Sequence, residues 1–328
     1  MNKNVEALIA KNRLPLVAAP MFLVSDRDTV IASCTAGITG TFPALNQRTT
    51  EGFQQWVQEI KAALAAFQEE NPDEPCGQYG VNLIVHRSNP RVQADLEVCV
   101  EEKVPLVITS LGAVKDVVQA VHSYGGVVFH DVTNRRHTEK AMEAGVDGVI
   151  LVSGGAGGHA GTLNPFALLA EIRSFFEGTI LLAGALSSGR DIAAARAMGA
   201  DLAYMGTRFI ATQESAAQEA YKEMVCRSKA EEIVYTPAVS GVPANFMRQS
   251  LEENGFDLEA LQRAGEVDFG KKLTVKDEAK AWKTIWSAGH GVSAIDTIPT
   301  IKELVLELEQ EYRETIESLH RDLSRSRS

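Results

Sequence analysis

The segment at residues 153–161 combines five glycines with a single histidine, His159. Bare glycine backbone can lie close against a flat ligand, and an imidazole can take a proton from a weak carbon acid near neutral pH. This spacing therefore indicates a ligand-binding loop that carries a general base. The same residues are also compatible with a flexible surface loop in which His159 is merely exposed, and the loop alone does not decide between the two.

Two further glycine-bearing segments, at residues 183–190 and 205–209, have the composition of an anion site. Gly184 and Gly206 would let backbone N–H groups approach an anion closely, and Thr207 adds a hydroxyl donor. In a TIM barrel the loops after the last two strands form a phosphate site of this kind. The alternative interpretation is that the glycines only make tight turns.

The elements that must position these residues are short apolar, β-branched runs that alternate with helical stretches. Runs that are apolar at nearly every position are typical of parallel strands buried on both faces. The predicted strands are 16–19, 38–42, 80–85, 106–109, 127–130, 146–152, 179–183 and 202–205. The predicted helices are 50–70, 90–102, 114–124, 136–144, 165–176 and 189–198. Eight such units predict an α/β fold, a (β/α)8 TIM barrel, with an open doubly wound sheet as the alternative.

The repeat stops after residue 209, and the rest of the chain has a different composition. We expect a barrel domain at 1–212, an added C-terminal helical lid that contacts substrate at 213–285, and a segment at 286–328 that returns to the barrel. The helix that begins near Thr300 carries one apolar face. This face predicts packing against the barrel or against the neighbouring subunit of a homodimer; its members are Ile301, Leu304, Leu308, Tyr312, Ile316 and Leu319.

Composition excludes several classes of protein. The 328-residue chain has 32 basic and 43 acidic residues, a net charge of −11, which argues against a nucleic-acid partner. Its four cysteines form no C-x-x-C pair, so neither a zinc site nor a disulfide framework is expected. The apolar stretch at 14–24 is too short to cross a membrane, and we expect a cytoplasmic protein without membrane contact. No spacing suits a metal, and no nucleophile-elbow motif is present.

Several segments together resemble the nitronate monooxygenase family, formerly called 2-nitropropane dioxygenases. The resemblance runs from about residue 15 to residue 291 and includes Trp286-Ser287-Ala288-Gly289. Its other segments are Ala19-Pro20-Met21, Gly80-Val81-Asn82-Leu83, Gly157-Gly158-His159-Ala160-Gly161, Ala183-Gly184, and Gly199-Ala200-Asp201 leading into Met205-Gly206-Thr207-Arg208-Phe209. The family consists of FMN-dependent TIM barrels with an added helical domain.

The resemblance implies a role for each matching residue. His159 corresponds to the catalytic base, and Asn82 should bond the edge of the isoalloxazine ring. The remaining cofactor contacts are Ala19, Pro20 and Met21 along the ring, Gly157 and Gly158 lining it, and Gly184, Ala185, Gly206 and Thr207 at the phosphate. The implied reaction is oxidation of small alkyl nitronates by O2 to a carbonyl compound and nitrite, with His159 deprotonating neutral nitroalkanes.

Two other functions fit the same pattern. NAD(P)H-dependent quinone reductases and enoyl-acyl-carrier-protein reductases share the barrel and its Gly-Gly-His loop. A non-catalytic flavin-binding protein would also keep the fold, although the presence of His159 argues against it.

The chain departs from the family pattern at several positions. Ala185 adds a methyl group where members usually have a second glycine. Val152-Ser153 replaces a polar residue that contacts the flavin in many members, and Gly155-Ala156 stands where Glu-Ala is common. Asp131 lies where relatives carry a basic residue. These differences leave FMN binding intact but weaken the assignment of the substrate.

Overall fold

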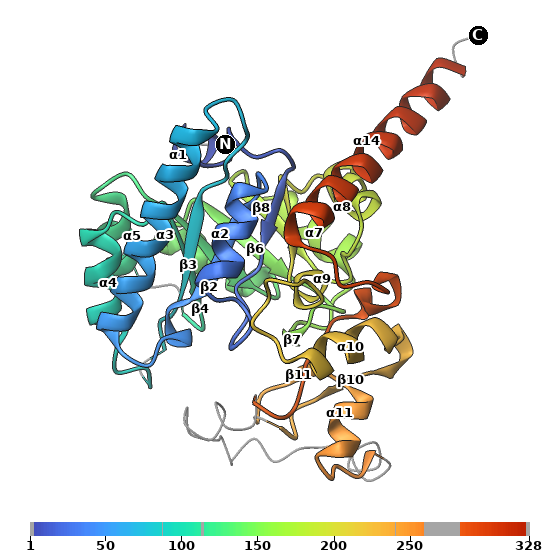
Figure 1. The fold of residues 1–328 in the computed structure, drawn as a ribbon. Helices are drawn as coiled ribbons and strands as arrows, with labels where there is room; N and C mark the ends of the chain where they lie inside the picture. The colour runs from blue at the N-terminus through green and yellow to red at the C-terminus, as the bar shows by residue number, and fades with distance from the viewer. Residues whose placement is uncertain (1–2, 87, 113–114, 240, 259–282, 326–328) are drawn as a thin grey trace.

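The computed structural model describes residues 3–86, 88–112, 115–239, 241–258 and 283–325 (Figure 1). Part of the predicted lid, Ser240 and residues 259–282, lies outside the described residues.

Eight parallel strands close into a barrel, because β1 pairs with β2 on one side and with β9 on the other. The TIM-barrel prediction is therefore confirmed. The barrel strands are β1 (Leu16–Ala18), β2 (Thr39–Pro43), β3 (Tyr79–Ile84), β4 (Leu106–Ser110), β5 (Val127–Val132), β6 (Gly148–Val152), β8 (Thr179–Ala183) and β9 (Leu202–Met205).

Helices connect successive strands and cover the outside of the barrel (Figure 1). All six predicted helices are present: α3 (Thr50–Glu70), α4 (Val92–Glu101), α5 (Lys115–His122), α6 (Arg135–Ala144), α7 (Pro165–Arg173) and α8 (Gly189–Ala197). The sequence did not predict α1 (Lys3–Ile9), α2 (Arg27–Thr35) or the single turn α9 (Thr207–Ile210). The apolar residues of α1 pack against residues that begin the barrel strands, such as Leu106 and Val127, so α1 covers the N-terminal end of the barrel.

Side-chain alternation along the strands decides which residues face the barrel interior. Ile108 of β4 and Phe129 of β5 belong to the interior cluster, so Ser110 and Asp131, two positions further on, also face inward at the C-terminal end. On β3 the neighbours of Asn82 pack outward against the helices, and Asn82 therefore faces inward. Three polar side chains on adjacent strands thus meet at the mouth of the barrel.

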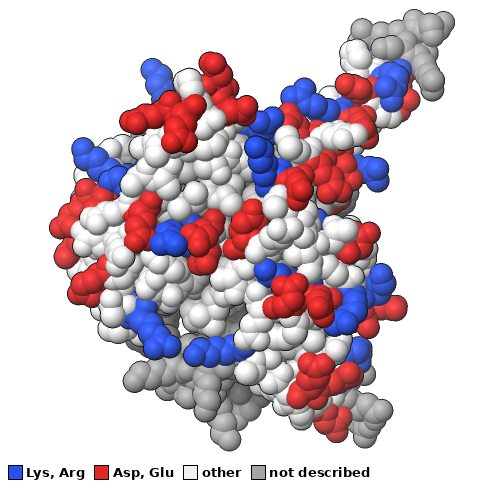
Figure 2. Space-filling model, viewed as in Figure 1, with Lys and Arg blue, Asp and Glu red and all other residues white. Residues whose placement is uncertain are grey.

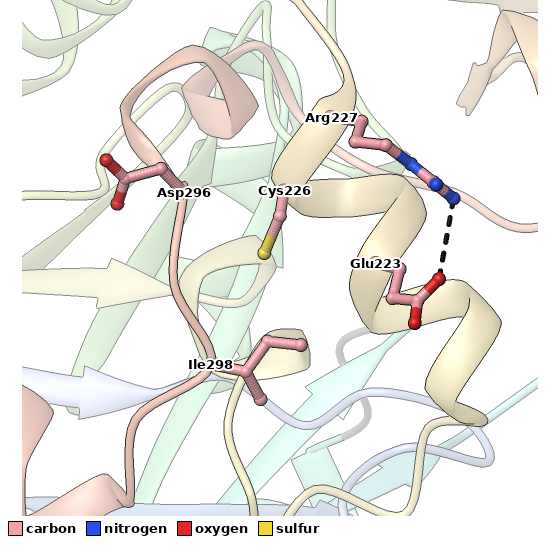
Figure 3. Close-up of a pocket in the computed structure, with 5 residues that line it drawn as sticks. All are labelled: Glu223, Cys226, Arg227, Asp296 and Ile298. Carbon is pink, nitrogen blue, oxygen red and sulfur yellow. Dashed lines mark ion pairs between the residues drawn. The ribbon is translucent and has the colours of Figure 1, made fainter.

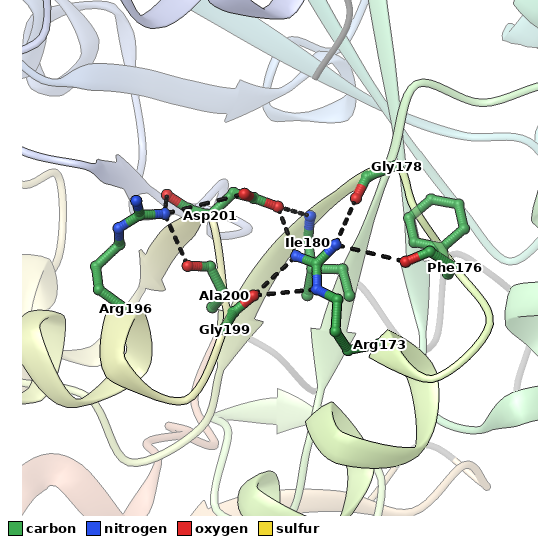
Figure 4. Close-up of polar contacts among 8 residues, drawn as sticks. All are labelled: Arg173, Phe176, Gly178, Ile180, Arg196, Gly199, Ala200 and Asp201. Atoms are coloured by element: carbon green, nitrogen blue, oxygen red, sulfur yellow. Dashed lines mark hydrogen bonds and ion pairs between the residues drawn. The ribbon is translucent and has the colours of Figure 1, made fainter.

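The opposite, N-terminal end of the barrel is stabilised by two half-buried aspartates, Asp201 and Asp147. Asp201 accepts a hydrogen bond from Ile180 N on β8 (2.8 Å) and pairs with Arg173 (2.7 Å), which also donates to Gly199 O (Figure 4). Asp147, which precedes β6, accepts from Val128 N on β5 in the same way (2.8 Å). The Gly199-Ala200-Asp201 segment of the family resemblance therefore stabilises the barrel far from its mouth.

The described part of the lid contains helices and a small sheet. Its elements are α10 (Glu219–Arg227), β10 (Ile233–Thr236), β11 (Ala244–Met247) and α11 (Arg248–Glu253). Strand β11 pairs antiparallel with β10 and with β7 (Gly158–His159), a short strand from the loop after β6. Only closure of the barrel brings β7 beside β11, which is why the sequence predicted helices alone for this region.

The C-terminal helix α14 (Ile301–Arg325) has two differently placed halves. Its first half is buried against the barrel helices, where Gly189 of α8 approaches so closely that a Cβ atom would overlap Leu308 O and Tyr312 N. Its second half projects from the body in Figure 1, and Ile316 and Leu319 are 42 % and 49 % exposed. The predicted packing against the barrel thus holds for the first half, and the subunit contact stays a prediction.

Two surface properties complete the fold. Among the described residues, no helix is both long and apolar enough to span a membrane. Acidic and basic side chains are interspersed over the face shown in Figure 2, without a large basic patch.

Candidate active site

The loop after β1 lies beside the end of β9. Ala19 N donates to Met205 O (2.8 Å). A side chain at Gly206 would place its Cβ 3.4 Å from Met21 Sδ and 3.6 Å from Ala19 Cβ. The structure therefore brings the predicted ring-contacting segment, which includes Pro20, next to the predicted phosphate-binding residue Gly206.

The loops after β6 and β8 interlock. Gly184 has a φ of +131°, and a Cβ atom there would overlap Ser153 Oγ, so only glycine fits. Ser153 is fully buried and donates to Ala183 O (2.6 Å), so this departure from the family pattern bonds to the neighbouring strand. Ala185 adopts the left-handed conformation (φ 57°), and its N–H donates to Gly155 O (3.3 Å).

The segment at 286–290 forms a further wall of the site. Gly289 N donates to Thr207 Oγ1 (2.9 Å), and His290 N donates to Gly155 O (2.9 Å). A Cβ atom at Gly157 would lie 3.0 Å from Gly289 N, so this glycine is needed for the close approach. Sequence reasoning noted this segment only as part of the resemblance, because no local pattern says where a chain returns to a barrel.

Helix α10 of the lid also holds the 286–290 segment in place. Tyr221 of α10 stacks on Trp286 with ring centroids 5.1 Å apart and donates to Ser287 O (2.5 Å). The 286–290 segment is therefore held from both the lid and the barrel.

His159 lies at the lip of the mouth, on β7. Its backbone pairs with Ala244 of β11, and Gly158 pairs with Asn245. The His159 side chain reaches solvent, but the surrounding protein desolvates it and lowers its pKa, which favours the neutral imidazole. A neutral imidazole is the form that can accept a proton.

Two lid residues that sequence reasoning missed hold this loop. Asn245 Nδ2 donates to Ala156 O (2.6 Å), and Tyr235 OH donates to Ala160 O (3.0 Å). Both are more than seventy positions away from the loop in the sequence, and no local signal connects them to it.

A chain of hydrogen-bonded polar side chains connects the ends of β3, β4 and β5 at the mouth. Asn82 Nδ2 donates to Ser110 Oγ (2.7 Å) and to Ile108 O (3.3 Å), and Ser110 Oγ donates to Asp131 Oδ2 (2.6 Å). Asp131 Oδ1 is buried and has no hydrogen-bond partner among the described residues. Burial raises the pKa of Asp131 to about 6, although the bond from Ser110 opposes this. Sequence reasoning did not single out Ser110, because serine at a strand end is common.

His130 is not part of the site. It follows the inward-facing Phe129, so it points out of the barrel, where its Nδ1 bonds Thr109 Oγ1 (2.7 Å). Burial lowers the pKa of His130 to about 4. The structure thus separates two adjacent titratable residues of β5, with only Asp131 at the mouth.

A surface hollow elsewhere contains none of the predicted site residues. It is lined by Glu223, Cys226 and Arg227 of α10 with Asp296 and Ile298 (Figure 3). Glu223 and Arg227 pair with each other (3.6 Å), and burial raises the pKa of Cys226, so its thiol stays protonated. This hollow offers no catalytic chemistry.

The mouth suits a flat molecule with an anionic end. The loops after β8 and β9 present a cradle at Gly184 and Gly206 in which a Cβ would meet other atoms of the site. In the barrel order β3 lies opposite β8, so the Asn82 amide faces the cradle from across the mouth. The phosphate and the polar ring edge of a flavin nucleotide match these two ends. No cluster of metal-ligating side chains occurs in the described residues.

A closed (β/α)8 barrel with a glycine cradle at its mouth has the features of a flavin-dependent TIM-barrel oxidoreductase, and the family match supports this class. The nitronate monooxygenase family model matches residues 8–311, and the chain belongs to that family.

Individual relatives show how far the similarity extends. The chain is 26 % identical to a nitronate monooxygenase of Paraburkholderia phytofirmans, over 93 % of this chain and 94 % of that protein. It is 28 % identical to a Mycobacterium tuberculosis (3aS,4S,5R,7aS)-5-hydroxy-7a-methyl-1-oxo-octahydro-1H-indene-4-carboxyl-CoA dehydrogenase, over 76 % of this chain and 66 % of that protein. The structure of FabK from Thermotoga maritima superposes with a TM-score of 0.77 at 25 % identity, covering 98 % of this chain and 99 % of FabK.

Proposed function

We propose that this protein is an FMN-dependent nitronate monooxygenase that converts small alkyl nitronates and O2 to a carbonyl compound and nitrite. The observation that carries the proposal is the combination of His159 on the loop after β6 with the glycine cradle formed by the loops after β8 and β9. Membership of the nitronate monooxygenase family supports the same reaction. We assign residues 1–212 to FMN binding, 213–285 to a substrate lid and 286–328 to a segment that returns to the barrel.

Each predicted residue has a task in this proposal. Asn82 would bond the edge of the ring. The phosphate would be held by Gly184, Ala185, Gly206 and Thr207, and the ring would lie along Ala19, Pro20, Met21, Gly157 and Gly158. The interlocked loops and the 286–290 segment fix these residues before a ligand arrives, which lowers the entropy cost of binding. When bound, FMN would accept electrons from the nitronate and make them available to O2.

His159 supplies the proton chemistry. Its lowered pKa favours the neutral imidazole, which can take the α-proton of a neutral nitroalkane and leave the anionic nitronate in the site. Because the side chain reaches solvent, the imidazole can pass this proton to water afterwards. An anionic nitronate has already lost that proton and needs no base.

This difference gives the test. The His159→Asn variant should keep FMN, seen by its visible absorbance, and keep turnover of ethylnitronate while losing turnover of nitroethane. His320→Asn, on the projecting part of α14, is the matched control and should change neither rate. Equal loss on both substrates, or no loss on either, would contradict the role of His159.

A reductase is the second candidate, favoured by the carboxyl of Asp131, which faces the barrel interior at the end of β5 and has no salt-bridge partner among the described residues. A negative charge beside a flavin favours its use as an electron donor, as an NAD(P)H-dependent quinone or enoyl-acyl-carrier-protein reductase requires. Anaerobic mixing distinguishes the two functions. Bleaching of the flavin by ethylnitronate alone supports the monooxygenase, whereas bleaching by NADH or NADPH with inert nitronate supports the reductase.

A further inference from the structure

Asp131 occupies a position in the mouth that the proposed reaction does not use. It faces the barrel interior from the end of β5, and it joins Asn82 through Ser110 in a continuous chain of hydrogen bonds. Asn82 is the residue expected to bond the edge of the cofactor ring. Asp131 is therefore one hydrogen-bonded residue away from the predicted ring contact.

The direction of this hydrogen-bond chain is fixed. Ile108 O can only accept, so the Asn82 amide turns its nitrogen toward Ile108 and Ser110. Ser110 Oγ then accepts from Asn82 and gives its own hydrogen to Asp131 Oδ2. The other oxygen, Oδ1, is buried without a hydrogen-bond partner among the described residues. The amide oxygen of Asn82 is thus the acceptor that this chain leaves for a ligand with an N–H group, whereas Oδ1 of Asp131 is enclosed by protein and acts on a ligand through the charge of the carboxyl.

The surroundings of Asp131 do not neutralise its charge. No salt bridge to Asp131 occurs in the described part of the chain. The titratable group across the interior is Tyr204 of β9, whose pKa is raised by burial and by the charge of Asp131, so it stays neutral. On the adjacent strand β6, Val152 is apolar and packs against the interior cluster. Above pH 6 the mouth therefore holds an uncompensated negative charge.

We propose that Asp131 is a cofactor-facing carboxyl that makes this site bind oxidised FMN more tightly than reduced FMN. The inference rests on the proposed FMN site. Reduced FMN carries more negative charge on its ring than oxidised FMN does, and a carboxylate facing the ring repels that charge. Tighter binding of the oxidised form lowers the reduction potential of the bound cofactor. Asp131 is in this sense a positioning and electrostatic residue, and its effect is independent of which substrate the enzyme takes.

The test measures FMN binding without turnover. The Kd of oxidised FMN and of anaerobically reduced FMN is determined by flavin fluorescence or calorimetry at pH 8 and at pH 5. We expect Asp131→Asn to lower the ratio of the reduced to the oxidised Kd at least tenfold at pH 8, which equals a rise of about 30 mV in the two-electron potential. At pH 5, where Asp131 is protonated, wild type and Asp131→Asn should give the same ratio. Asp116→Asn on the outer helix α5 is the charge-matched control and should leave the ratio unchanged.

Ser110→Ala provides a variant that keeps the carboxyl. Loss of its hydrogen bond to Asp131 should move the pH at which the ratio changes upward, because that bond favours the ionised form. This variant and the pH dependence of wild type decide the matter even if Asp131→Asn does not fold.

The outcomes distinguish a failure of the role proposed for Asp131 from a failure of the proposed FMN site. If wild-type protein binds oxidised FMN, but its ratio equals that of Asp131→Asn at pH 8, the role of Asp131 is wrong and the FMN site stands. If wild-type protein binds neither form of FMN, the proposed function fails, and the inference fails with it.

Discussion

Gly184 provides a sharp test of how the cofactor cradle is built. A methyl group at this position would overlap Ser153 Oγ and lie 3.1 Å from Gly154 O, and the backbone φ is +131°. Gly184→Ala therefore combines two costs that a single measurement cannot separate. Steric overlap can be relieved by removing its partner, whereas backbone strain cannot.

The free-energy cost of the backbone strain and of the steric overlap can each be estimated from the structure. A non-glycine residue in this sparsely populated region costs about 1–3 kcal/mol, and overpacking at a buried contact costs about 1–3 kcal/mol more. Gly184→Ala should thus lower the free energy of unfolding by about 2–6 kcal/mol. Ser153→Ala alone loses its bond to Ala183 O, which costs about 1 kcal/mol. In the double variant the nearest remaining atom of residue 153 is its Cβ, 3.5 Å away, which is an ordinary contact.

A double-mutant cycle measured by urea unfolding then isolates the overlap. We expect the double variant to be more stable than the sum of the single variants predicts, by about 1–3 kcal/mol. Gly199→Ala, with φ +104° and no atom near its Cβ, is the control for backbone strain alone. Additivity within about 0.5 kcal/mol would refute the view that Ser153 forces glycine at position 184.

Three further predictions follow from other parts of the structure. Ala185→Gly relieves a left-handed alanine that costs about 1–2 kcal/mol, offset by about 0.5–1 kcal/mol of unfolded-state entropy, so urea unfolding should show a small gain in stability. Asp201→Ala leaves Ile180 N without its acceptor and removes the carboxylate that pairs with Arg173, so it should cost about 2–4 kcal/mol by the same measurement, whereas Asp322→Ala on the exposed end of α14 should cost almost nothing. The pKa of His130 is about 4 in the folded protein, below its unfolded value, so the neutral imidazole adds about 3 kcal/mol to the free energy of unfolding above pH 6.5, and this is lost as the pH falls toward 4. His130→Asn should remove this pH dependence of stability. A pH profile of stability equal to that of wild type would contradict the prediction.

The elements of the barrel could be predicted from the sequence because their signals are local. The helix 50–70 was predicted with its observed bounds, and eight apolar runs appear as eight strands. Such runs need burial on both faces, and a closed barrel with outer helices provides it. The helix α2 was missed because its buried face includes the small polar residues Thr29 and Ser33, whose side chains bond within the helix region rather than forming an apolar stripe.

The candidate site residues also followed from the sequence, since strand ends are local features and barrel sites lie at one end. The sequence could not say that His159 would join a lid strand, because β7 and β11 are separated by more than eighty residues. The same holds for Asn245, which fixes the loop after β6 from within the lid.

What the sequence by itself determined is the order of the strands and helices, the polar residues at the strand ends and the family. What only the tertiary structure decided is which of those polar side chains meet. Hydrophobic periodicity separates inward from outward positions, but hydrogen bonds such as Asn82 to Ser110 to Asp131 depend on the register between strands in the closed sheet. That register is set by packing over the whole barrel, and no local stretch of sequence contains it.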